Sequence, residues 1–409
     1  MNPILLTILC IITAEFILNR WLSILNIKHA GNQVPELLAD IYDAERYAKQ
    51  QDYFRTNSRF GMLTNTVSFI IIFLTFLLGF YGWLDGVVQH WTDNSLLQSL
   101  LFFGLFFLIT DILFIPFSLY SVFVIEEKFG FNKQTPMLFI KDKIQMWLVI
   151  LILGGLLIPT IAWIYSLTPT YFWLLAFGLV TAFSLFMSMF YSDLIVPLFN
   201  KQTPLEEGAL RTAIEEFSDK AGFKLKNIYM IDGSKRSTKA NAYFTGFGPK
   251  KRIVLYDTLT EQMTNKEIVA VLAHEIGHYK HKHIIKSMLI SIPSSLLLFY
   301  LLGWILGNDA VAQALGGQQA NFHLNAFAFF TLYTPVSLLL DIASNVLSRK
   351  HEFQADAFVK QYDLGEDLVS ALKKLSSHTL SNLTPHPLPV FFNYSHPTLY
   401  QRITKIKGL

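Results

Sequence analysis

The sequence Val271-Leu-Ala-His-Glu-Ile-Gly-His-Tyr279 contains the pattern His274-Glu275-x-x-His278. Residues four apart on an α-helix lie on one face, one turn above each other, so both imidazoles can point at one tetrahedral zinc ion. Glu275 sits one position round from His274, where its carboxylate can reach a water on that zinc. A surface helix with two solvated histidines is the alternative. The rest of the chain must therefore show whether it brings this helix a third ligand.

The composition is that of a membrane protein with many spans. Of the 409 residues, 52% are hydrophobic, only 15% are charged, and 36 are phenylalanine. Average globular chains carry about 25% charged residues. The net charge of +3 gives no reason to expect nucleic acid as a partner. Cys10 is the single cysteine, which excludes an internal disulfide and a cysteine-based metal site.

Seven apolar stretches reach the roughly 20 residues that a helix needs to cross a bilayer. The first starts at the N-terminus without the basic segment of a cleaved signal peptide, so we expect a retained transmembrane helix. The third is longer than a span requires and carries Pro116, which predicts a tilt or kink. The predicted spans are residues 4–25, 64–84, 96–125, 147–165, 171–191, 284–306 and 326–347.

Lysine and arginine alternate strictly between the connections of these spans. The connections without either residue are 1–3, 85–95, 166–170 and 307–325, and the basic ones are 26–63, 126–146, 192–283 and 348–409. Because cytosolic connections carry the excess of basic residues, the N-terminus is expected outside and the C-terminus in the cytosol. The predicted parts are a membrane domain (1–191), a cytosolic catalytic portion (192–283), two further spans (284–347) and a cytosolic tail (348–409).

The histidine pattern comes at the end of the cytosolic catalytic portion. We expect a helix at about 205–221, strands at 227–231 and 252–256, and a helix that begins near Asn265 behind the capping sequence Thr264-Asn-Lys-Glu267. That last helix is predicted to continue into the sixth span. The metal site is therefore expected at the cytosolic mouth of a transmembrane helix.

Some residues inside the predicted spans are polar, and five of them are candidates for cavity lining or for polar packing between helices. Ionisable groups in a bilayer face a protein interior or a water-filled cavity, and polar packing between helices is the simpler alternative. The five residues are Glu15, Asn19, Asp111, Asp341 and Asn345. Outside the membrane, residues 35–56 are predicted to form a polar cytosolic helix with a solvated face.

A third zinc ligand is expected from the end of the seventh span, which reaches the same cytosolic level. The chain continues there as Ser348-Arg-Lys-His-Glu352-Phe-Gln-Ala-Asp356. A catalytic zinc takes three protein ligands and keeps one position open, and Glu352 would be the third. Asp356 lies four residues further on and would accept the other ring N–H of a ligand histidine. The alternative is an ordinary acidic helix face.

Three further histidines lie close to the pattern in sequence. His281 is three residues from His278, a spacing at which the two can pair in principle. We expect His281, His283 and His351 to be interfacial or solvated, and we leave open that His283 packs near the site.

With zinc bound, the chemistry of peptide hydrolysis follows. The metal lowers the pKa of its water and polarises a carbonyl. Glu275 takes the proton from the water and delivers it to the leaving amine. The tetrahedral oxyanion needs a further positive or hydrogen-bonding partner. His396 and Arg402, in Tyr394-Ser-His-Pro-Thr-Leu-Tyr-Gln-Arg402, are weak candidates on the sequence alone.

Several long motifs make the chain resemble the integral-membrane zinc CAAX prenyl proteases, the type I CAAX endopeptidases. The resemblance covers nearly the whole length. It rests on the zinc pattern, on Glu352 to Asp356 and on Tyr394-Ser-His-Pro397. It also rests on three longer motifs, which are Phe123-Val-Ile-Glu-Glu-Lys-Phe-Gly-Phe-Asn-Lys-Gln-Thr135, Asp232-Gly-Ser-Lys-Arg-Ser237 and Asn241-Ala-Tyr-Phe-Thr-Gly-Phe247.

The resemblance implies an all-α polytopic fold in which seven transmembrane helices surround a water-filled chamber, with a small α+β cytosolic zinc metalloprotease portion. It makes the polar membrane residues cavity lining, and it implies one zinc ion per chain. Asn241, Ala242 and Tyr243 would lie on a strand that pairs with extended substrate. His396 and Arg402 would face the substrate or transition state. The implied reaction removes the C-terminal tripeptide of a prenylated Cys-a-a-X protein. The implied enzyme is a monomer surrounded by membrane lipid.

One departure concerns the source. The chain lacks the long cytosolic insertion of the animal members between the fifth and sixth spans, so it resembles a bacterial or minimal member. Its membrane would be the bacterial inner membrane, or the endoplasmic reticulum if the source is eukaryotic.

Three alternative functions differ from a CAAX prenyl protease in the class of protein or in the substrate. A membrane-protein quality-control protease would share the zinc pattern and cut more broadly. A site-2-type intramembrane protease would use an aspartate such as that of Leu84-Asp-Gly86, which is predicted to lie in a loop on the wrong side of the membrane. A non-catalytic channel or transporter with a structural zinc would lack the general base, whereas Glu275 is present.

Overall fold

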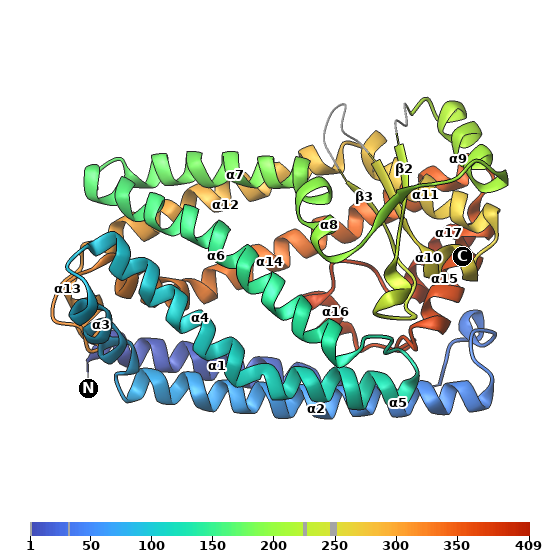
Figure 1. Cartoon of the computed structure of the whole chain (residues 1–409). Coiled ribbons are helices and arrows are strands. Elements are labelled where there is room, and N and C mark those ends of the chain that lie inside the picture. Colours follow the sequence, from blue (N-terminus) through green and yellow to red (C-terminus); the bar gives the residue numbers. More distant parts are fainter. Residues whose placement is uncertain (1, 32, 224–226, 246–251) are drawn as a thin grey trace.

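The computed structural model describes the chain except residues 1, 32, 224–226 and 246–251. Among the described residues, seven helical segments are long and apolar enough to cross a membrane, which confirms the predicted number. Figure 1 shows them running along one long axis, with the two termini at opposite ends, as an odd number of crossings requires. Their helices are α1 (Pro3–His29), α2 (Ala44–Leu77), α4 (Ser95–Tyr120), α6 (Pro136–Leu167), α7 (Phe172–Leu194), α12 (His283–Leu306) and α14 (Phe322–Lys360).

Two of these segments are extended by shorter helices. Beyond Pro116, α4 passes into a π-helical stretch, Ser121–Glu126, and then into α5 (Glu127–Phe129). The fifth segment ends in α8 (Val196–Phe199). The other short helices are α3 (Phe80–Trp91), α9 (Ala209–Lys220), α10 (Asp257–Gln262), α11 (Asn265–Lys280), α13 (Asp309–Ala314), α15 (Gly365–His378), α16 (Pro387–Asn393) and α17 (Leu399–Lys407).

The second span differs from the prediction at both ends. It begins at Ala44, so most of the expected cytosolic helix 35–56 is continuous with the span. It ends at Leu77, because Gly79 adopts a left-handed backbone (φ 71°) and redirects the chain into α3. Asp85 therefore lies on a helix and not in the predicted loop. Its buried carboxylate contacts His323 at 2.7 Å, which ties α3 to the start of α14.

A small sheet stands at the end of the molecule where the C-terminus lies (Figure 1). Its order is β1 (Gln202–Pro204), β2 (Asn227–Ile231), β4 (Arg252–Tyr256) and β3 (Ala242–Thr245). β2 and β4 are parallel and match the predicted strands, while the other pairs are antiparallel. Buried residues of β2 and β4 join those of α9 and α11 in one hydrophobic core. This core fixes the position of α11, the helix that carries the histidine pattern.

The beginning of α11 confirms the predicted cap. Thr264 and Glu267 form a reciprocal capping box. The Glu267 carboxylate is buried and also accepts hydrogen bonds from Ser370 at 2.6 Å and from Lys374 at 2.7 Å, both on α15. Burial alone would raise the pKa of Glu267, but these donors outweigh it and lower the pKa from 4.5 to about 2. The cap thus also ties α11 to α15.

The end of α11 contradicts the prediction of a helix that continues into the sixth span. α11 ends at Lys280, Lys282 adopts a left-handed backbone (φ 56°), and α12 begins at His283. The sequence pattern does not reveal this break. Apolar residues favour a helix both before it, in α11, and after it, in α12.

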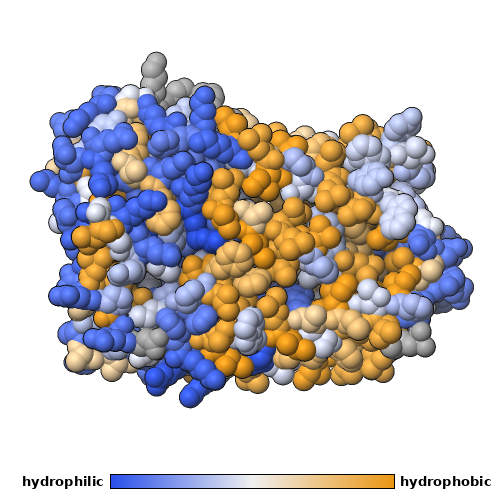
Figure 2. Space-filling view, turned by 180° about the vertical axis from the view of Figure 1, so that it is seen from behind, coloured by the Kyte–Doolittle hydropathy of each residue, from blue (hydrophilic) through white to orange (hydrophobic). Residues whose placement is uncertain are grey.

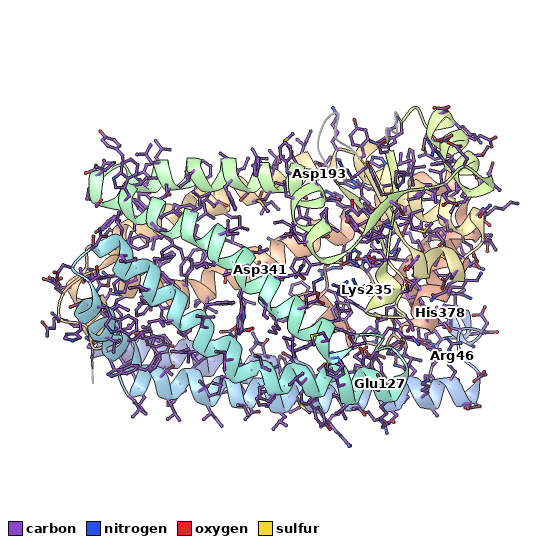
Figure 3. All side chains as sticks on the ribbon, viewed as in Figure 1. Arg46, Glu127, Asp193, Lys235, Asp341 and His378 are labelled. Carbon is purple, nitrogen blue, oxygen red and sulfur yellow. The ribbon has the colours of Figure 1, made fainter. Side chains whose placement is uncertain are left out.

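The surface and the polar residues agree with a membrane protein. Figure 2 shows a broad apolar band over the helices and a large hydrophilic surface at the end that carries the small sheet. In Figure 3, Arg46, Lys235 and His378 lie at that end, whereas Asp341 lies among the long helices. These observations, with the seven spans and the small sheet, confirm the predicted fold class.

Two of the five polar membrane residues make hydrogen bonds between segments. Asp111 pairs with Lys143 at 2.8 Å and also accepts from Trp147, and it borders a 790 Å³ cavity between α4 and α6. Asn345 donates to the carbonyl of Phe392 on α16 at 2.9 Å. Asp111 therefore serves both as a link between helices and as part of a cavity wall.

Replacing Glu267 with alanine should lower the free energy of unfolding by about 1–3 kcal/mol, because buried hydrogen bonds to a charged group are lost. Thermal unfolding in detergent would measure it. Since the folded pKa lies below 4.5, this stabilisation is present above that pH and is lost as the pH falls toward 2. Glu261→Ala is the control, because Glu261 is exposed and makes no hydrogen bond or ion pair within the described residues. Equal midpoints for both variants would contradict the role of Glu267.

Candidate active site

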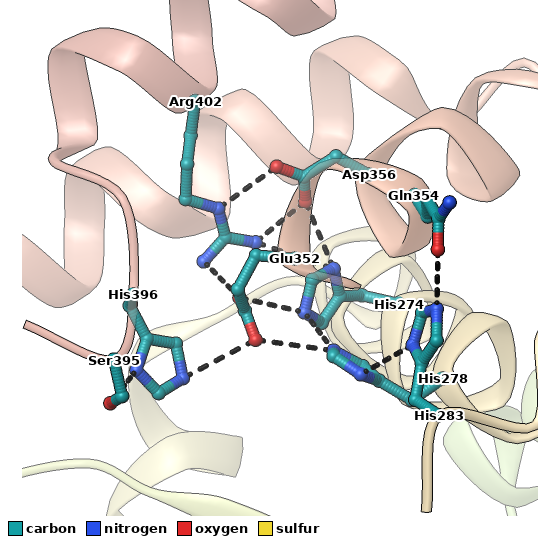
Figure 4. A network of polar contacts seen from close by, with 9 residues as sticks. All are labelled: His274, His278, His283, Glu352, Gln354, Asp356, Ser395, His396 and Arg402. Atoms are coloured by element: carbon teal, nitrogen blue, oxygen red, sulfur yellow. Dashed lines mark hydrogen bonds and ion pairs between the residues drawn. The ribbon is translucent and has the colours of Figure 1, made fainter. Parts of the chain in front are cut away.

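The candidate metal centre lies where α11 crosses α14. Gly277, inside the histidine pattern, faces α14 so closely that a Cβ there would lie 3.1 Å from the Cα of Ala355 and 3.1 Å from the Cβ of Phe358. Any side chain there would require the facing atoms of α14 to move by a few tenths of an ångström, so glycine suits this approach. It brings His274 and His278 on α11 opposite Glu352 on α14 (Figure 4).

The distances among the three side chains fit a tetrahedral zinc. Nε2 of His274 and Nε2 of His278 are 3.1 Å apart, and each lies 3.3 Å from an oxygen of Glu352. Ligand atoms placed about 2.0–2.1 Å from zinc at the tetrahedral angle are separated by about 3.3 Å. Oε2 of Glu352 is buried and accepts no well-formed hydrogen bond, since its nearest polar neighbours are Nε2 of His274 at 3.3 Å and Nη1 of Arg402 at 3.5 Å, and a cation at this point would satisfy it better. The donor set therefore suits zinc.

His274 is held from its other side by Asp356, as the sequence predicts. Nδ1 of His274 lies 2.9 Å from Oδ1 of Asp356. Asp356 in turn accepts two hydrogen bonds from Arg402 on α17, at 2.6 and 3.0 Å. Burial alone would lower the pKa of His274, but its contacts with Asp356 and Glu352 outweigh it and raise the pKa. The pair Asp356 and Arg402 thus orients the imidazole.

The structure corrects the expectation for His351, and for His283 it favours the alternative that this residue packs near the site. His283 and His351 are buried, at 3% and 4% exposure, and are not solvated. Nδ1 of His283 lies 3.0 Å from Nδ1 of His278, and the His283 ring stacks on that of His351. His281 is half-buried, and its ring stacks on that of His283 with ring centres 5.4 Å apart. The break after α11 causes this arrangement, since it returns the chain toward the metal centre.

A cavity of 420 Å³ opens in front of the metal centre. Glu275 borders it and makes no hydrogen bond within the described chain, so its carboxylate is available to a water or substrate. His396 is exposed, and its Nε2 lies 3.4 Å from Oε1 of Glu352. Arg402 also borders the cavity, although its strongest hydrogen bonds go to Asp356. The cavity thus unites the predicted base with both candidate partners of the oxyanion.

The predicted substrate strand lies at the edge of the sheet and at the cavity. Ala242 begins β3, and Asn241 directly precedes it rather than lying within it. Both residues border the cavity, whereas Tyr243 does not. Gly246 and Phe247, the last two residues of the motif quoted for the resemblance, lie outside the described residues.

One wall of the cavity was missed from the sequence. Leu368, Leu372 and Leu375 on α15 border it. Their spacing of four and three residues marks the apolar face of an amphipathic helix, which predicts burial but not contact with a catalytic cavity. Gly277 was also missed, because its role depends on a helix that is remote in sequence.

Comparison with known proteins places this site in a family. A model described as "Peptidase family M48" matches residues 204–409. The chain belongs to peptidase family M48. A model described as "CAAX prenyl protease N-terminal, five membrane helices" matches residues 23–201 of this M48 protein. Together the two models account for almost all of the chain.

Relatives that match this chain over nearly its full length are named CAAX prenyl proteases. The CAAX prenyl protease 1 homolog of Oryza sativa is 35% identical over 99% of this chain and 97% of the relative. CAAX prenyl protease 1 of Saccharomyces cerevisiae is 34% identical, over 93% of this chain and 89% of the relative. The crystal structure of S. mikatae Ste24p has a TM-score of 0.92 at 32% identity and covers 99% of both chains.

These comparisons confirm the resemblance drawn from the sequence motifs. The chain is a multi-pass integral membrane protein and a zinc metalloendopeptidase, and it acts on a peptide or protein substrate. The family and the geometry agree that a metal is used, since the His274, His278 and Glu352 ligand atoms lie within 4.8 Å of one another.

Replacing Glu352 with alanine should remove most of the bound zinc, because it takes away one of three ligands and leaves two histidines. Metal analysis of the purified protein would measure zinc per chain. Glu261→Ala, an exposed glutamate outside the site, should keep the zinc of the wild-type protein. Full zinc retention in the Glu352 variant would show that another group is the ligand.

Proposed function

We propose that the chain removes the C-terminal tripeptide of prenylated Cys-a-a-X proteins at the cytosolic face of its membrane. The observation that carries the chemistry is the pairing of a His274, His278 and Glu352 centre with an unpaired Glu275 at one cavity. The substrate class is supported by the names of the relatives, which are CAAX prenyl proteases over nearly their full length. The cytosolic location is supported by the strict alternation of basic connections.

His274, His278 and Glu352 would hold one zinc ion per chain. When bound, zinc polarises the substrate carbonyl and lowers the pKa of a water molecule. Glu275 takes a proton from the attacking water and passes it to the nitrogen of the leaving peptide. Asp356 keeps the proton of His274 on Nδ1, so that Nε2 stays free to bind the metal.

The substrate would bind in extended form along Asn241, Ala242 and Tyr243. β3 is an edge strand among the described residues, and its beginning borders the cavity, so a peptide added to this edge passes Glu275. His396 is the more accessible partner for the oxyanion, because 65% of its side chain is exposed, against 11% for Arg402. Arg402 would then act mainly by holding Asp356.

The surroundings would be those of a monomer in membrane lipid. The large apolar band of Figure 2 is the surface that lipid would cover. The water-filled chamber implied by the resemblance stays a prediction, and Asp111, at the 790 Å³ cavity, is the polar membrane residue that best fits it.

A broader quality-control protease is the second candidate function. The cavity supports it in one respect, because leucines of α15 and the polar Ser376, Thr379 and Ser381 line it together, a mixed surface that suits varied peptide side chains. A non-catalytic protein with a structural zinc would need a fourth protein ligand, and the metal cluster found in the described residues has three.

The variant Glu275→Gln should retain zinc and lose peptide cleavage by about 10²–10⁴-fold or more, because the amide cannot take the proton from water. Cleavage is measured with a prenylated Cys-a-a-X peptide, and zinc by metal analysis of the same sample. Glu261→Gln should leave both unchanged. Unimpaired cleavage by the Glu275 variant would refute its role as the base.

The substrate class is tested with two peptides of one sequence, prenylated and unprenylated. We expect the wild-type enzyme to cleave the prenylated peptide preferentially, and a zinc chelator to stop cleavage. Equal cleavage of both peptides would favour the broader protease. Cleavage that survives removal of zinc would refute the metal mechanism.

A further inference from the structure

We propose that His283 is the residue that positions the zinc ligand His278, and that Gln354 sets the tautomer of His283 that makes this possible. The inference rests on the zinc site of the proposed function and adds two residues to it. It starts from an asymmetry: His274 is oriented by a carboxylate, Asp356, whereas the matching nitrogen of His278 faces another imidazole.

In the hydrogen bond between the two imidazoles, one ring must be the donor and the other the acceptor. Nδ1 of His278 and Nδ1 of His283 are 3.0 Å apart, so one of them carries the hydrogen and the other accepts it. If His278 donates from Nδ1, its Nε2 keeps a lone pair. That Nε2 is the atom that faces His274 and Glu352 in the metal centre. The opposite direction would put the hydrogen on Nε2 and prevent metal binding.

Gln354 selects the productive direction. Its side-chain oxygen lies 2.9 Å from Nε2 of His283 (Figure 4). A carbonyl oxygen only accepts, so Nε2 of His283 carries the hydrogen. In the neutral ring, Nδ1 of His283 is then free to accept from His278. The chain of hydrogen bonds runs from His278 through His283 to Gln354, which lies two residues after the ligand Glu352.

The fold holds His283 firmly in this place. Its ring is 3% exposed and stacks on His351, with ring centres 4.0 Å apart and planes inclined by 11°. On an uninterrupted helix, residues five apart point about 140° away from each other, so His283 would face away from His278. The left-handed backbone at Lys282 ends that geometry and lets the first residue of α12 turn back. The helix break thus has a use in the site.

A neutral acceptor also suits the charge of the site. The metal centre already gathers the carboxylates of Glu275, Glu352 and Asp356, with Arg402 as the nearby cation. A carboxylate partner makes a ligand histidine more electron-donating. His283 orients His278 without adding a further negative charge, so the metal stays a stronger Lewis acid than it would beside a fourth carboxylate.

The test compares His283→Phe with His281→Phe in the full-length protein. Phenylalanine keeps a ring to stack on His351 but cannot accept from His278. Zinc affinity is measured by competition with a chromophoric chelator, and the cobalt-substituted protein is examined by visible absorption. We expect zinc binding about 10–100-fold weaker and an altered cobalt spectrum in His283→Phe. His281→Phe keeps an aromatic ring at the position that stacks on His283 and leaves the hydrogen bonds of His283 in place, so it should match the wild type.

The conservative variant His283→Asn should recover much of the affinity and the cobalt spectrum, because its amide oxygen takes the place of Nδ1. If His283→Phe and His281→Phe bind zinc equally and give the same spectrum, the proposal is overturned. It is also overturned if His283→Asn behaves like His283→Phe.

A second pair of variants serves if His283→Phe does not fold. Gln354→Met removes the acceptor and should weaken zinc binding. Gln354→Glu keeps an acceptor and should bind zinc as the wild type does. Equal zinc affinities of these two variants would overturn the proposal. Failure of the wild-type protein to bind zinc would overturn the proposed metal site itself. Zinc binding by the wild type with no effect of these variants would overturn only the role of His283 and Gln354.

Discussion

The close crossing of α11 and α14 at Gly277 is the contact on which the site depends. Carbon atoms in contact are about 3.5–4.0 Å apart, and a Cβ at residue 277 would lie 3.1 Å from two atoms of α14. A side chain at residue 277 would require the facing atoms of α14 to move by a few tenths of an ångström. The glycine between the two histidines therefore favours the close approach that brings Glu352 to them.

The charges around this crossing favour a bound cation. Glu352 and Asp356 are buried on α14 at 4% and 2% exposure, and Arg402 is the basic side chain that contacts both. Burying unbalanced negative charge costs free energy unless a cation or hydrogen bonds offset it. The raised pKa of His274 has the same origin, since a proton on the ring supplies part of the missing positive charge. A metal ion would supply it more completely.

The sheet and α15 support the crossing from outside the membrane spans. The buried residues of β2 and β4 pack on α11, and the cap at Glu267 joins α11 to α15. The same α15 contributes an apolar wall to the cavity. The elements that fix α11 therefore also line the cavity at the metal centre, which both Ala242 of the edge strand β3 and Glu275 of α11 border.

The sequence by itself determined the seven spans, two strands of the sheet, the cap of α11 and the residues that meet at the metal centre. These follow from local patterns: hydropathy over about 20 residues, the capping box, and spacings of four on a helix. Only the tertiary structure decided that α11 stops before α12, that α2 ends at Leu77, and that His283 and Gln354 stand behind His278. A left-handed residue, a helix crossing and a hydrogen bond between segments 71 residues apart depend on packing, which neighbouring residues in the sequence do not encode.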